Sequence, residues 1–555
     1  MRLRVDDNPR NAPDVRDPRY RREMLGRTTC LTLLLLAACK QNQHSPDGDV
    51  QPDGPDGPHW IDRCDALAAM YAAPAIPGTP LRTLYVDGAT GDDTRTGTSP
   101  TEAWKTLAKA NASVRAGDRV LLAGTFTNEQ IAPAASGTET DRIVYQAADA
   151  SQPPTLTTNI AAISLVNRKY IVIDGLEVQQ SAGDAVYMSS AVSSWIRNVH
   201  FHNAGTSRMW TSTDNRIEDC TFDAVGSPLM YARDGDDRNV FARNAFTNAS
   251  ISWGMNDNTA APSRDNVFFA NDFVNHRGGS IDIGGVATGT LFECNAIHES
   301  GIDKTAGMQG PDQPEAGAGP ALTLTASQET IRYNKFYANK WEVIRLQASG
   351  DCTNASGVHD VSDNLIQHNI FYGNGGPNLR IMNSGPGPSG CGGATPLWGD
   401  TANNRIENNL YWKNAQFCDF HFCDVPDNTI YAVVFGFYHT EQNTWPSGAT
   451  GLNGNVIRNN FIGRDTATAG TAWMRWEGYT YAGSHAYTLA EAEAKYPSEV
   501  TGNSELDPML RDPDAAAFEP LPGSPAIDFG APLDGMTFEG AAPDPGRYEL
   551  VPMTQ

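Results

Sequence analysis

The stretches IRYNKF (331–336), IQHNIF (366–371) and IENNLY (406–411) repeat one phrase, and this phrase decides the fold. It consists of an apolar residue, two variable residues, a fixed column, one further residue and an apolar or aromatic anchor. Between Tyr170 and Ile462 it recurs nine times, and its fixed column reads Val199, Cys220, Asn244, Asn271, Asn295, Asn334, Asn369, Asn409 and Asn460. A short phrase that recurs in this way is typical of a solenoid, whose units bury their apolar faces against their neighbours.

The spacing of the anchors identifies the kind of solenoid. Successive steps are 21, 24, 27 and 24 residues, between anchors at Phe201, Phe222, Phe246, Phe273 and Ile297. Apolar residues alternate within each unit, as in SIDI (280–283), and this is the periodicity of a strand rather than a helix. The sequence therefore predicts an all-β fold, a parallel β-helix of short strands. An asparagine at its inward turns can hydrogen-bond main-chain groups of the next coil.

The steps lengthen after Ile297, to 39, 35, 40 and 51 residues, which predicts long inserted loops. Insertions on a solenoid project from one face, often the binding face. Before the repeats, Ser99, Pro100 and Glu102 form a helix start signal. We expect a helix over about 100–115 that covers the open N-terminal end of the solenoid.

The N-terminus resembles an export signal. Arg21, Arg22 and Arg27 precede the apolar stretch CLTLLLLAAC (30–39), which is too short to span a membrane. Its last four residues resemble the lipobox of bacterial lipoproteins, which implies lipidation of Cys39; ordinary signal cleavage is the alternative. We expect a signal region at 1–39 with Met24 as a possible start, a Pro/Asp/Gly-rich tether and short lead-in at 40–80, and the β-helix at 81–550. The protein is then exported and anchored to a bacterial membrane or cell surface through lipid alone.

An oxidising compartment permits disulfides. The expected pairs are Cys352 with Cys391 and Cys418 with Cys423, and zinc binding by these four residues is the alternative. Cys220 lies in the fixed column and is expected to be a buried free thiol, whereas Cys64 has no assigned partner. The formal net charge of −24 argues against a nucleic-acid partner. We expect a monomer.

Short strings at both ends of the repeats resemble a known group of proteins. They are YVDG (85–88), AWKTL (103–107), AGDRV (116–120), AGTF (123–126), PGSPAID (522–528) and DPGRYE (544–549). They are similar to the opening and closing segments of secreted right-handed parallel β-helix proteins. That group includes polysaccharide lyases of the pectate-lyase and chondroitinase-B/alginate-lyase types. The resemblance implies a right-handed fold and a polysaccharide partner, and it leaves the substrate open.

One strand of each repeat offers a candidate binding stripe. If its flanking apolar residues point inward, the outward residues are Tyr187, Trp210, Met230, Ser252, Asp282, Thr323, Arg345, Arg380 and Arg475. Aromatic rings suit sugars, and guanidinium groups suit carboxylates or sulfates. We select Tyr187, Trp210, Asp282 and Arg475 as substrate-binding residues. The alternative is an ordinary solvated face, and a register slip of one residue would invert the stripe.

Lyases of the resembling group use a lysine or arginine to remove the proton next to a uronate carboxylate, which calcium neutralises. The resemblance implies Lys304, Arg345 and Arg380 as candidate catalytic residues. Asp234, Asp236 and Asp237 are the candidate calcium ligands, with a plain polar turn as the alternative.

Other chemistries have weaker support in the sequence. His200, His202, His276 and His298 lack a tight metal-ligand spacing. Hydrolysis would need a carboxylate pair, such as Asp282 with Asp303. The sequence therefore favours a calcium-assisted lyase that cleaves a uronate-containing glycan by β-elimination, and the alternative is a non-catalytic surface protein that binds a glycan or a partner.

Overall fold

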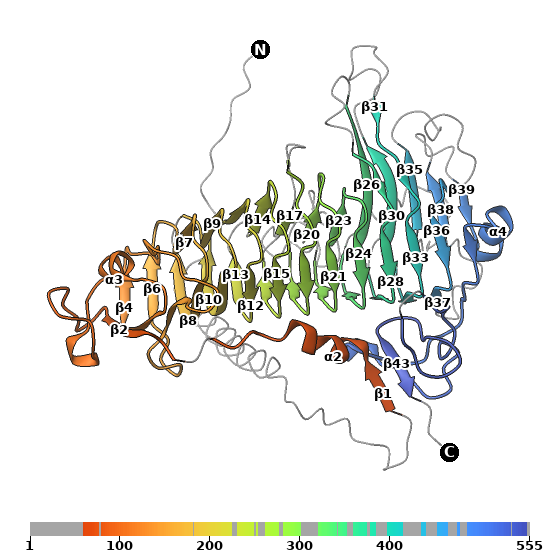
Figure 1. The fold of residues 1–555 in the computed structure, drawn as a ribbon. Coiled ribbons are helices and arrows are strands. Elements are labelled where there is room, and N and C mark those ends of the chain that lie inside the picture. Colours follow the sequence, from red (N-terminus) through yellow and green to blue (C-terminus); the bar gives the residue numbers. More distant parts are fainter. Residues whose placement is uncertain are drawn as a thin grey trace, which may run out of the picture. The chain divides into compact units, whose positions relative to one another are not determined.

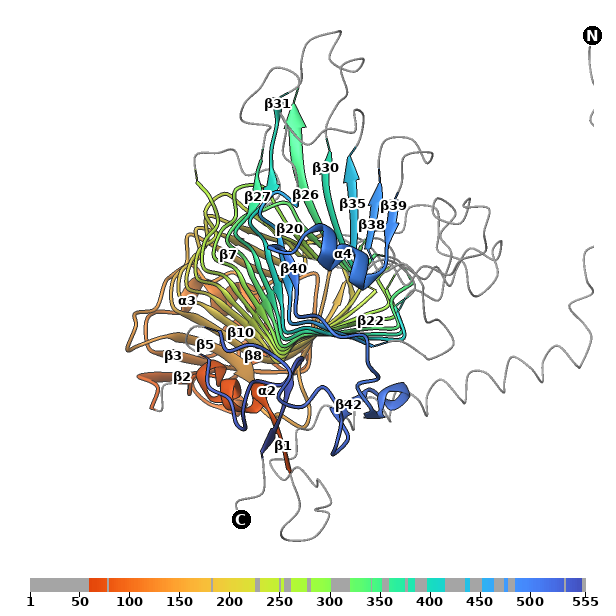
Figure 2. The ribbon, with the colours of Figure 1, turned by 90° about the vertical axis from the view of Figure 1, so that its right-hand side faces the viewer.

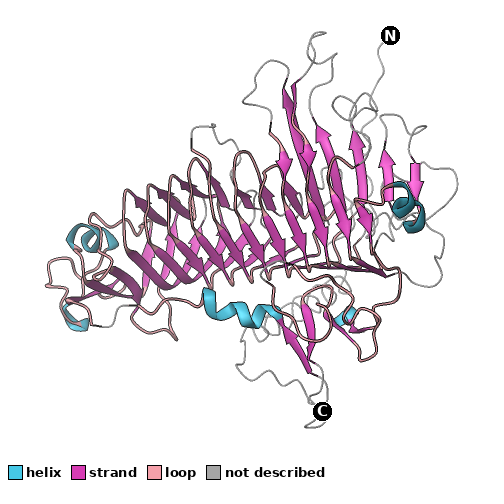
Figure 3. Ribbon diagram, turned by 45° about the vertical axis from the view of Figure 1, so that its right-hand side comes forward, coloured by secondary structure: helices cyan, strands magenta, loops and turns pink. Residues whose placement is uncertain are grey.

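The computed structural model describes residues 59–76, 79–180, 183–224, 230–248, 251–253, 261–276, 281–300, 320–340, 342–351, 359–374, 378–384, 397–414, 435–439, 452–463, 474–477, 485–533 and 536–551. Strands from successive coils pair in parallel and lie side by side along the coil axis, and they form three long sheets that run in that direction (Figures 1 and 2). The predicted all-β solenoid is confirmed. Strands dominate every coil and helices are few (Figure 3).

The first sheet contains the strands that precede the fixed column: β2 (Arg82–Asp87), β3 (Asp118–Ala123), β5 (Ile143–Ala147), β8 (Ile171–Gln180), β10 (Trp195–Ala204), β12 (Arg216–Glu218), β15 (Val240–Ala242), β18 (Val267–Phe269), β21 (Leu291–Glu293), β24 (Thr330–Arg332), β28 (Leu365–Gln367), β33 (Arg405–Glu407), β36 (Val456–Arg458) and β40 (Val500–Thr501). The second sheet follows the column and contains the second halves of β8 and β10 with β4 (Thr125–Thr127), β6 (Thr155–Thr158), β13 (Thr221–Ala224), β16 (Ala245–Thr247), β19 (Asp272–Val274), β22 (Ala296–His298), β25 (Lys335–Tyr337), β29 (Ile370–Tyr372), β34 (Leu410–Trp412) and β37 (Phe461–Gly463).

The third sheet closes each coil. It contains β7 (Ile163–Val166), β9 (Val186–Ser189), β11 (Ser207–Trp210), β14 (Met230–Arg233), β17 (Ile251–Trp253), β20 (Ile281–Ile283), β23 (Leu322–Leu324), β26 (Ile344–Asp351), β30 (Leu379–Ser384), β35 (Phe435–His439), β38 (Met474–Glu477) and the antiparallel β39 (His485–Tyr487). The remaining described elements are β1 (His59–Asp62), β27 (Val361–Ser362), β31 (Leu397–Trp398), β32 (Thr401–Ala402), β41 (Leu510–Asp512), β42 (Ala517–Pro520), β43 (Tyr548–Val551), α2 (Arg63–Ala68), α3 (Leu107–Ser113), α4 (Leu489–Lys495) and the 3₁₀ turns at Ala69–Tyr71, Pro100–Glu102 and Pro513–Ala515.

The turn between the first and second sheets depends on one left-handed residue per coil. The residue just before the fixed column has a positive φ in every repeat, as in Arg243 (55°), Ala270 (52°) and Tyr333 (59°). A non-glycine residue adopts this conformation at a cost. The asparagine ladder that follows offsets this cost.

The fixed column forms the expected ladder. The side-chain carbonyl of Asn369 accepts from both the main-chain and side-chain N–H groups of Asn334, at 3.0 and 2.9 Å. The Asn369 amide in turn donates to the Ile331 carbonyl (2.9 Å). This pattern repeats from Asn244 to Asn460 and continues to Asn503. The anchors pack beneath the ladder, and the rings of Phe201, Phe222, Phe246 and Phe273 stack with centroids 4.7–5.0 Å apart.

A second ladder, which the sequence analysis missed, lies five residues before the first. Asn215, Asn239 and Asn266 are bonded in succession, as are Asn364, Asn404 and Asn455. In the coils between these two groups, Thr290 and Glu329 occupy the ladder positions, and the Thr290 N–H donates to the Glu329 carboxyl. The interior therefore contains one carboxyl group in a row of amides.

The predicted helix over 100–115 is wrong in its extent. A 3₁₀ turn at Pro100–Glu102, with Ser99 as its N-cap, is followed by β-type pairing of Trp104 with Val86, and α3 begins only at Leu107. Thr106 caps α3, whose Leu107 and Ala110 are buried in the main core. That α3 closes the end of the solenoid stays a prediction.

The lead-in after residue 59 and the C-terminal segment pack on the outside of the coils. The structure joins Cys64 to Cys294 by a disulfide, whereas Cys220 is a buried free thiol as expected. Tyr71 stacks on Phe269 of the first sheet, and the β1 strand pairs with β43. Among the described residues, no helix has the length and apolar character needed to cross a bilayer.

Candidate functional site

The outer face of the third sheet carries most of the predicted stripe. Register pairing places one residue of each strand in a single column: Ser164, Tyr187, Arg208, Tyr231, Ser252, Asp282, Thr323, Arg345, Arg380, Gly436 and Arg475. For Ser252, Gly436 and Arg475 the structure gives the register position alone. Trp210 lies two residues beyond Arg208 on the same face. The column thus passes from aromatic to charged side chains along the stack.

Met230 is an exception to the predicted stripe. Its side chain is buried, and the neighbouring Tyr231 takes the outward position because Met230 pairs with the buried Ser207. In this coil the outward position is therefore one residue later than the predicted one. A shift of one residue moves a side chain to the opposite face of a strand.

Two guanidinium groups share one buried carboxylate at the charged end of the column. Glu342 precedes β26 and is almost fully buried. Its Oε2 accepts from Arg345 Nε at 2.7 Å, and its Oε1 accepts from Arg380 Nη1. Arg345 and Arg380 are register partners on adjacent strands, so Glu342 orients both forks on one patch of the sheet. Each guanidinium presents its N–H donors as a planar fork, the geometry that matches a carboxylate.

Asp282 lies two strands from Arg345 in the same column, which corresponds to about 10 Å between the strands at the usual spacing. Burial raises the pKa of Asp282 to about 6, although the charge of Arg345 acts in the opposite direction. Its Oδ1 is buried and has no hydrogen-bond partner among the described residues. A carboxyl group with such a pKa can accept or give a proton near neutral pH.

The aromatic end of the face has a different character. Tyr187 and Trp210 meet edge to face with ring centroids 5.6 Å apart. The Arg233 guanidinium lies 5.2 Å from the Trp210 ring centroid. The indole N–H of Trp210 is buried without a hydrogen-bond partner in the described part of the chain. Half-buried rings next to a cation form a surface on which sugar rings can stack.

The predicted calcium ligands do not form one group. Asp236 is fully buried, and its two carboxylate oxygens accept from the main-chain N–H groups of Ser212 (2.7 Å) and Arg233 (2.8 Å). Asp234 pairs with Arg233, and Asp237 accepts from the Arg264 N–H. Calcium needs six or more oxygen ligands around one point. These residues therefore do not fit calcium, and the alternative, a structural turn, agrees with these contacts.

Several predicted residues lie outside the described residues: Cys39, Asp303, Lys304, Cys352, Cys391, Cys418 and Cys423. For Arg475 the structure gives the register position only. Their proposed roles stay predictions.

Sequence reasoning missed Glu342 and the partnership of Cys64 with Cys294. A signal for Glu342 existed, because a glutamate precedes Arg345 by three residues. Sequence reasoning also gave too little weight to His200 and His202. These two residues lie on either side of the inward Phe201 and so share an outer face with Glu177. No local signal connects Cys64 with Cys294, which are 230 residues apart.

The family model described as "Right handed beta helix region" matches residues 155–297, within the stacked coils described above. The fold is a right-handed parallel β-helix. No curated protein sequence matches the chain significantly.

Solved structures with similar coils include several carbohydrate-active enzymes. Pectate lyase Pel9A is 14% identical with a TM-score of 0.40, over 85% of this chain and 97% of its own. The PL6 family alginate lyase AlyGC is 14% identical with a TM-score of 0.41, over 81% and 60% of the two chains. The GH136 lacto-N-biosidase from Eubacterium ramulus is 11% identical with a TM-score of 0.40, over 59% and 68%.

Proposed function

We propose that the β-helix binds an acidic polysaccharide along the third sheet and cleaves it by β-elimination. The observation that carries this proposal is the outward column in which Arg345 and Arg380, both oriented by Glu342, lie near Asp282. Two guanidinium forks on one patch can hold a uronate carboxylate. The protein as a whole is strongly acidic, so this patch is a local basic site on an otherwise repelling molecule.

The proposed roles differ from those expected from the resemblance. Arg345 and Arg380 bind and neutralise the substrate carboxylate, because a paired guanidinium is an anion-binding group. Asp282 accepts the proton next to that carboxylate, since its pKa of about 6 leaves it ionised at neutral pH. The electrons of the broken C–H bond form the carbon–carbon double bond. The glycosidic oxygen leaves with the bonding pair and takes a proton from water. No step of this proposal uses calcium, because the expected ligands do not fit the ion.

The test is the ultraviolet absorbance of the unsaturated uronate product, measured on pectate, alginate and glycosaminoglycans with and without a chelator. Asp282→Asn should reduce turnover by about 10²-fold or more. Arg345→Ala should raise KM. The control is Arg238→Ala, which removes another ion-paired arginine, the partner of Asp214, and should leave activity unchanged. The acid limb of the pH–rate profile should fall as the pH drops through about 6. Product formation that survives Asp282→Asn would assign the base to another residue, such as Lys304.

The aromatic end favours a second candidate function, which is non-catalytic glycan binding. Tyr187, Trp210 and Arg233 form an aromatic and cationic surface that suits sugar rings and offers no carboxylate base. If no glycan yields product but the protein is retained on an immobilised glycan, and Trp210→Ala abolishes retention, then the protein is a binding module.

We also propose that the chain is exported and anchored through Cys39. The Cys64–Cys294 disulfide supports this proposal, because such bonds persist in oxidising compartments. Labelling with a radioactive fatty acid, lost in Cys39→Ala, tests the anchor.

A further inference from the structure

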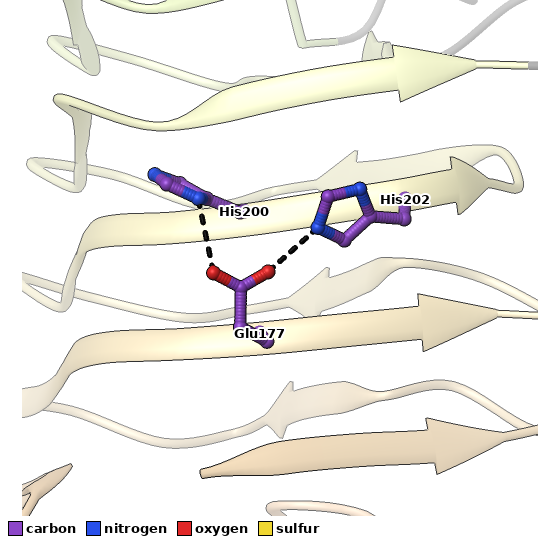
Figure 4. A group of neighbouring side chains, drawn as sticks. All are labelled: Glu177, His200 and His202. Carbon is purple, nitrogen blue, oxygen red and sulfur yellow. Dashed lines mark hydrogen bonds and ion pairs between the residues drawn. The ribbon is translucent and has the colours of Figure 1, made fainter. Parts of the chain in front are cut away.

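A second group of convergent side chains lies on the outer face of the second sheet, a different sheet from the candidate site. Glu177 is on β8, and His200 and His202 are on β10 in the next coil (Figure 4). His200 lies directly opposite Glu177 in the register, and His202 follows two residues later. Because alternate residues of a strand share a face, the buried Phe201 between them directs both imidazoles outward.

The three side chains point toward one another. Glu177 Oε1 lies 3.1 Å from His200 Nδ1, and Glu177 Oε2 lies 2.6 Å from His202 Nε2. One ligand atom from each residue falls within 4.8 Å of the other two. The imidazole planes are nearly perpendicular, at 83°, so the rings do not stack on each other. The carboxylate therefore lies between two nitrogen donors that come from one strand.

We propose that Glu177, His200 and His202 bind a divalent transition-metal ion, with zinc as the ion to test. Two imidazoles and one carboxylate are a donor set that zinc takes in sites with an open fourth position. Imidazole nitrogen favours zinc and its neighbours over calcium or magnesium, which prefer oxygen. This site is chemically distinct from the calcium site that the sequence predicted.

The three side chains are accessible to an ion from solvent, and they need little rearrangement to bind it. The side chains of His200 and His202 are 51% and 47% exposed, and that of Glu177 is 24% exposed. β8 and β10 are paired over seven residues, and Phe201 stacks on Phe222 beneath the site, so the strands hold the three residues in place. Ligand atoms of a tetrahedral zinc ion lie about 3.4 Å apart, given bonds of about 2.1 Å. Small side-chain rotations therefore suffice to close the group around an ion.

The competing account is a glutamate that only hydrogen-bonds two histidines. The same sheet offers a matched control for it, because His298 Nε2 on β22 lies 3.0 Å from Asp272 Oδ1 on β19. Glu299 Oε1 lies 3.8 Å from the other ring nitrogen of His298, Nδ1, so it does not converge with Asp272 on one ligand atom. His298 and Asp272 thus provide an imidazole–carboxylate pair of the same chemistry and sheet. This pair should bind zinc only weakly, because one imidazole nitrogen and one carboxylate oxygen supply two ligands where zinc takes three or four from the protein.

The experiment titrates the full-length chain, stripped by a chelator, with zinc in a calorimeter and with cobalt under visible absorbance. Wild-type protein should bind about one equivalent at this site, and cobalt should give the absorption of a low-symmetry site with nitrogen ligands. Binding should weaken as the pH is lowered, since protons compete for the imidazoles. Glu177→Gln, which keeps the size of the side chain, His200→Ala and His202→Ala should each lower the affinity at least about tenfold.

The control variant His298→Gln should bind zinc as the wild type does. Circular dichroism of each variant checks that the coils remain folded. Absence of saturable binding in the wild type overturns the proposal, and so does equal affinity in Glu177→Gln and the wild type. Neither result bears on lyase activity, which depends on the third sheet.

Discussion

Burial raises the pKa of both Asp282 and Glu329, but the two carboxyl groups lie in different parts of the stack. Asp282 faces outward from the third sheet, where a substrate could reach it, whereas Glu329 is fully buried in the second ladder. Burial raises the pKa of Glu329 to about 8, so the group is protonated at neutral pH and resembles the amides around it. Only the outward group can serve chemistry, because only it can meet a ligand.

Glu329 should make the stability of the protein fall as the pH rises. The unfolded chain loses the proton near pH 4.5, whereas the folded chain keeps it until about pH 8. Between these values the folded state binds more protons, so the free energy of unfolding decreases with pH and levels off above about 8. Each pKa unit corresponds to about 1.4 kcal/mol, so the total change is several kcal/mol.

Glu329→Gln should remove this slope and raise the denaturation midpoint at alkaline pH. The measurement is urea denaturation at several pH values, with the exposed Glu139→Gln as control. A variant and wild type with parallel pH profiles would show that Glu329 is ionised in the fold.

At the scale of the element, the turn between the first and second sheets combines a residue of positive φ with the asparagine of the fixed column that follows it. The fixed asparagine column could be predicted because it recurs at one position in a phrase, and periodic signals accumulate over many coils. The second ladder lies outside the phrase and its column is mixed, with Thr290 and Glu329 among the asparagines. The outward position of Tyr231 could not be predicted either, since alternation does not reveal where a strand begins.

Asn369→Ala should destabilise the stack by about 3–5 kcal/mol. The substitution removes the acceptor of the Asn334 N–H and the donor to the Ile331 carbonyl, and both of these groups are buried. Each buried polar group left without a partner costs about 1–3 kcal/mol. Urea or thermal denaturation measures the loss, and Asn159→Ala at an exposed position is the control. Equal midpoints for the two variants would mean that water replaces the ladder bonds.

At the scale of the whole molecule, contacts between distant segments fasten the lead-in to the coils. Arg63 donates to the carbonyl of Gly546 (2.7 Å) and pairs with Glu549, and Arg547 pairs with Asp62. Arg216 and Arg243 both donate to the Tyr71 carbonyl. None of these contacts has a sequence signal, because each joins residues more than 100 positions apart.

Removal of the Cys64–Cys294 bond should loosen the lead-in. Cys64→Ser with Cys294→Ser should lower the free energy of unfolding by about 2–5 kcal/mol, as for other native disulfides. Denaturation under non-reducing conditions measures the effect, and limited proteolysis should show earlier cleavage near Tyr71. An unchanged midpoint together with unchanged proteolysis would show that the arginine contacts alone hold the segment.

The pairing of β1 with β43 also constrains the order of biogenesis. Residues near position 60 leave the ribosome and any export channel long before their hydrogen-bond partners near position 548. The coils can stack progressively as they emerge, whereas the first strand has to wait for the last one. Nascent chains that stall before residue 540 should therefore display an unpaired β1 strand, which a protease or a chaperone could recognise as the mark of an unfinished molecule.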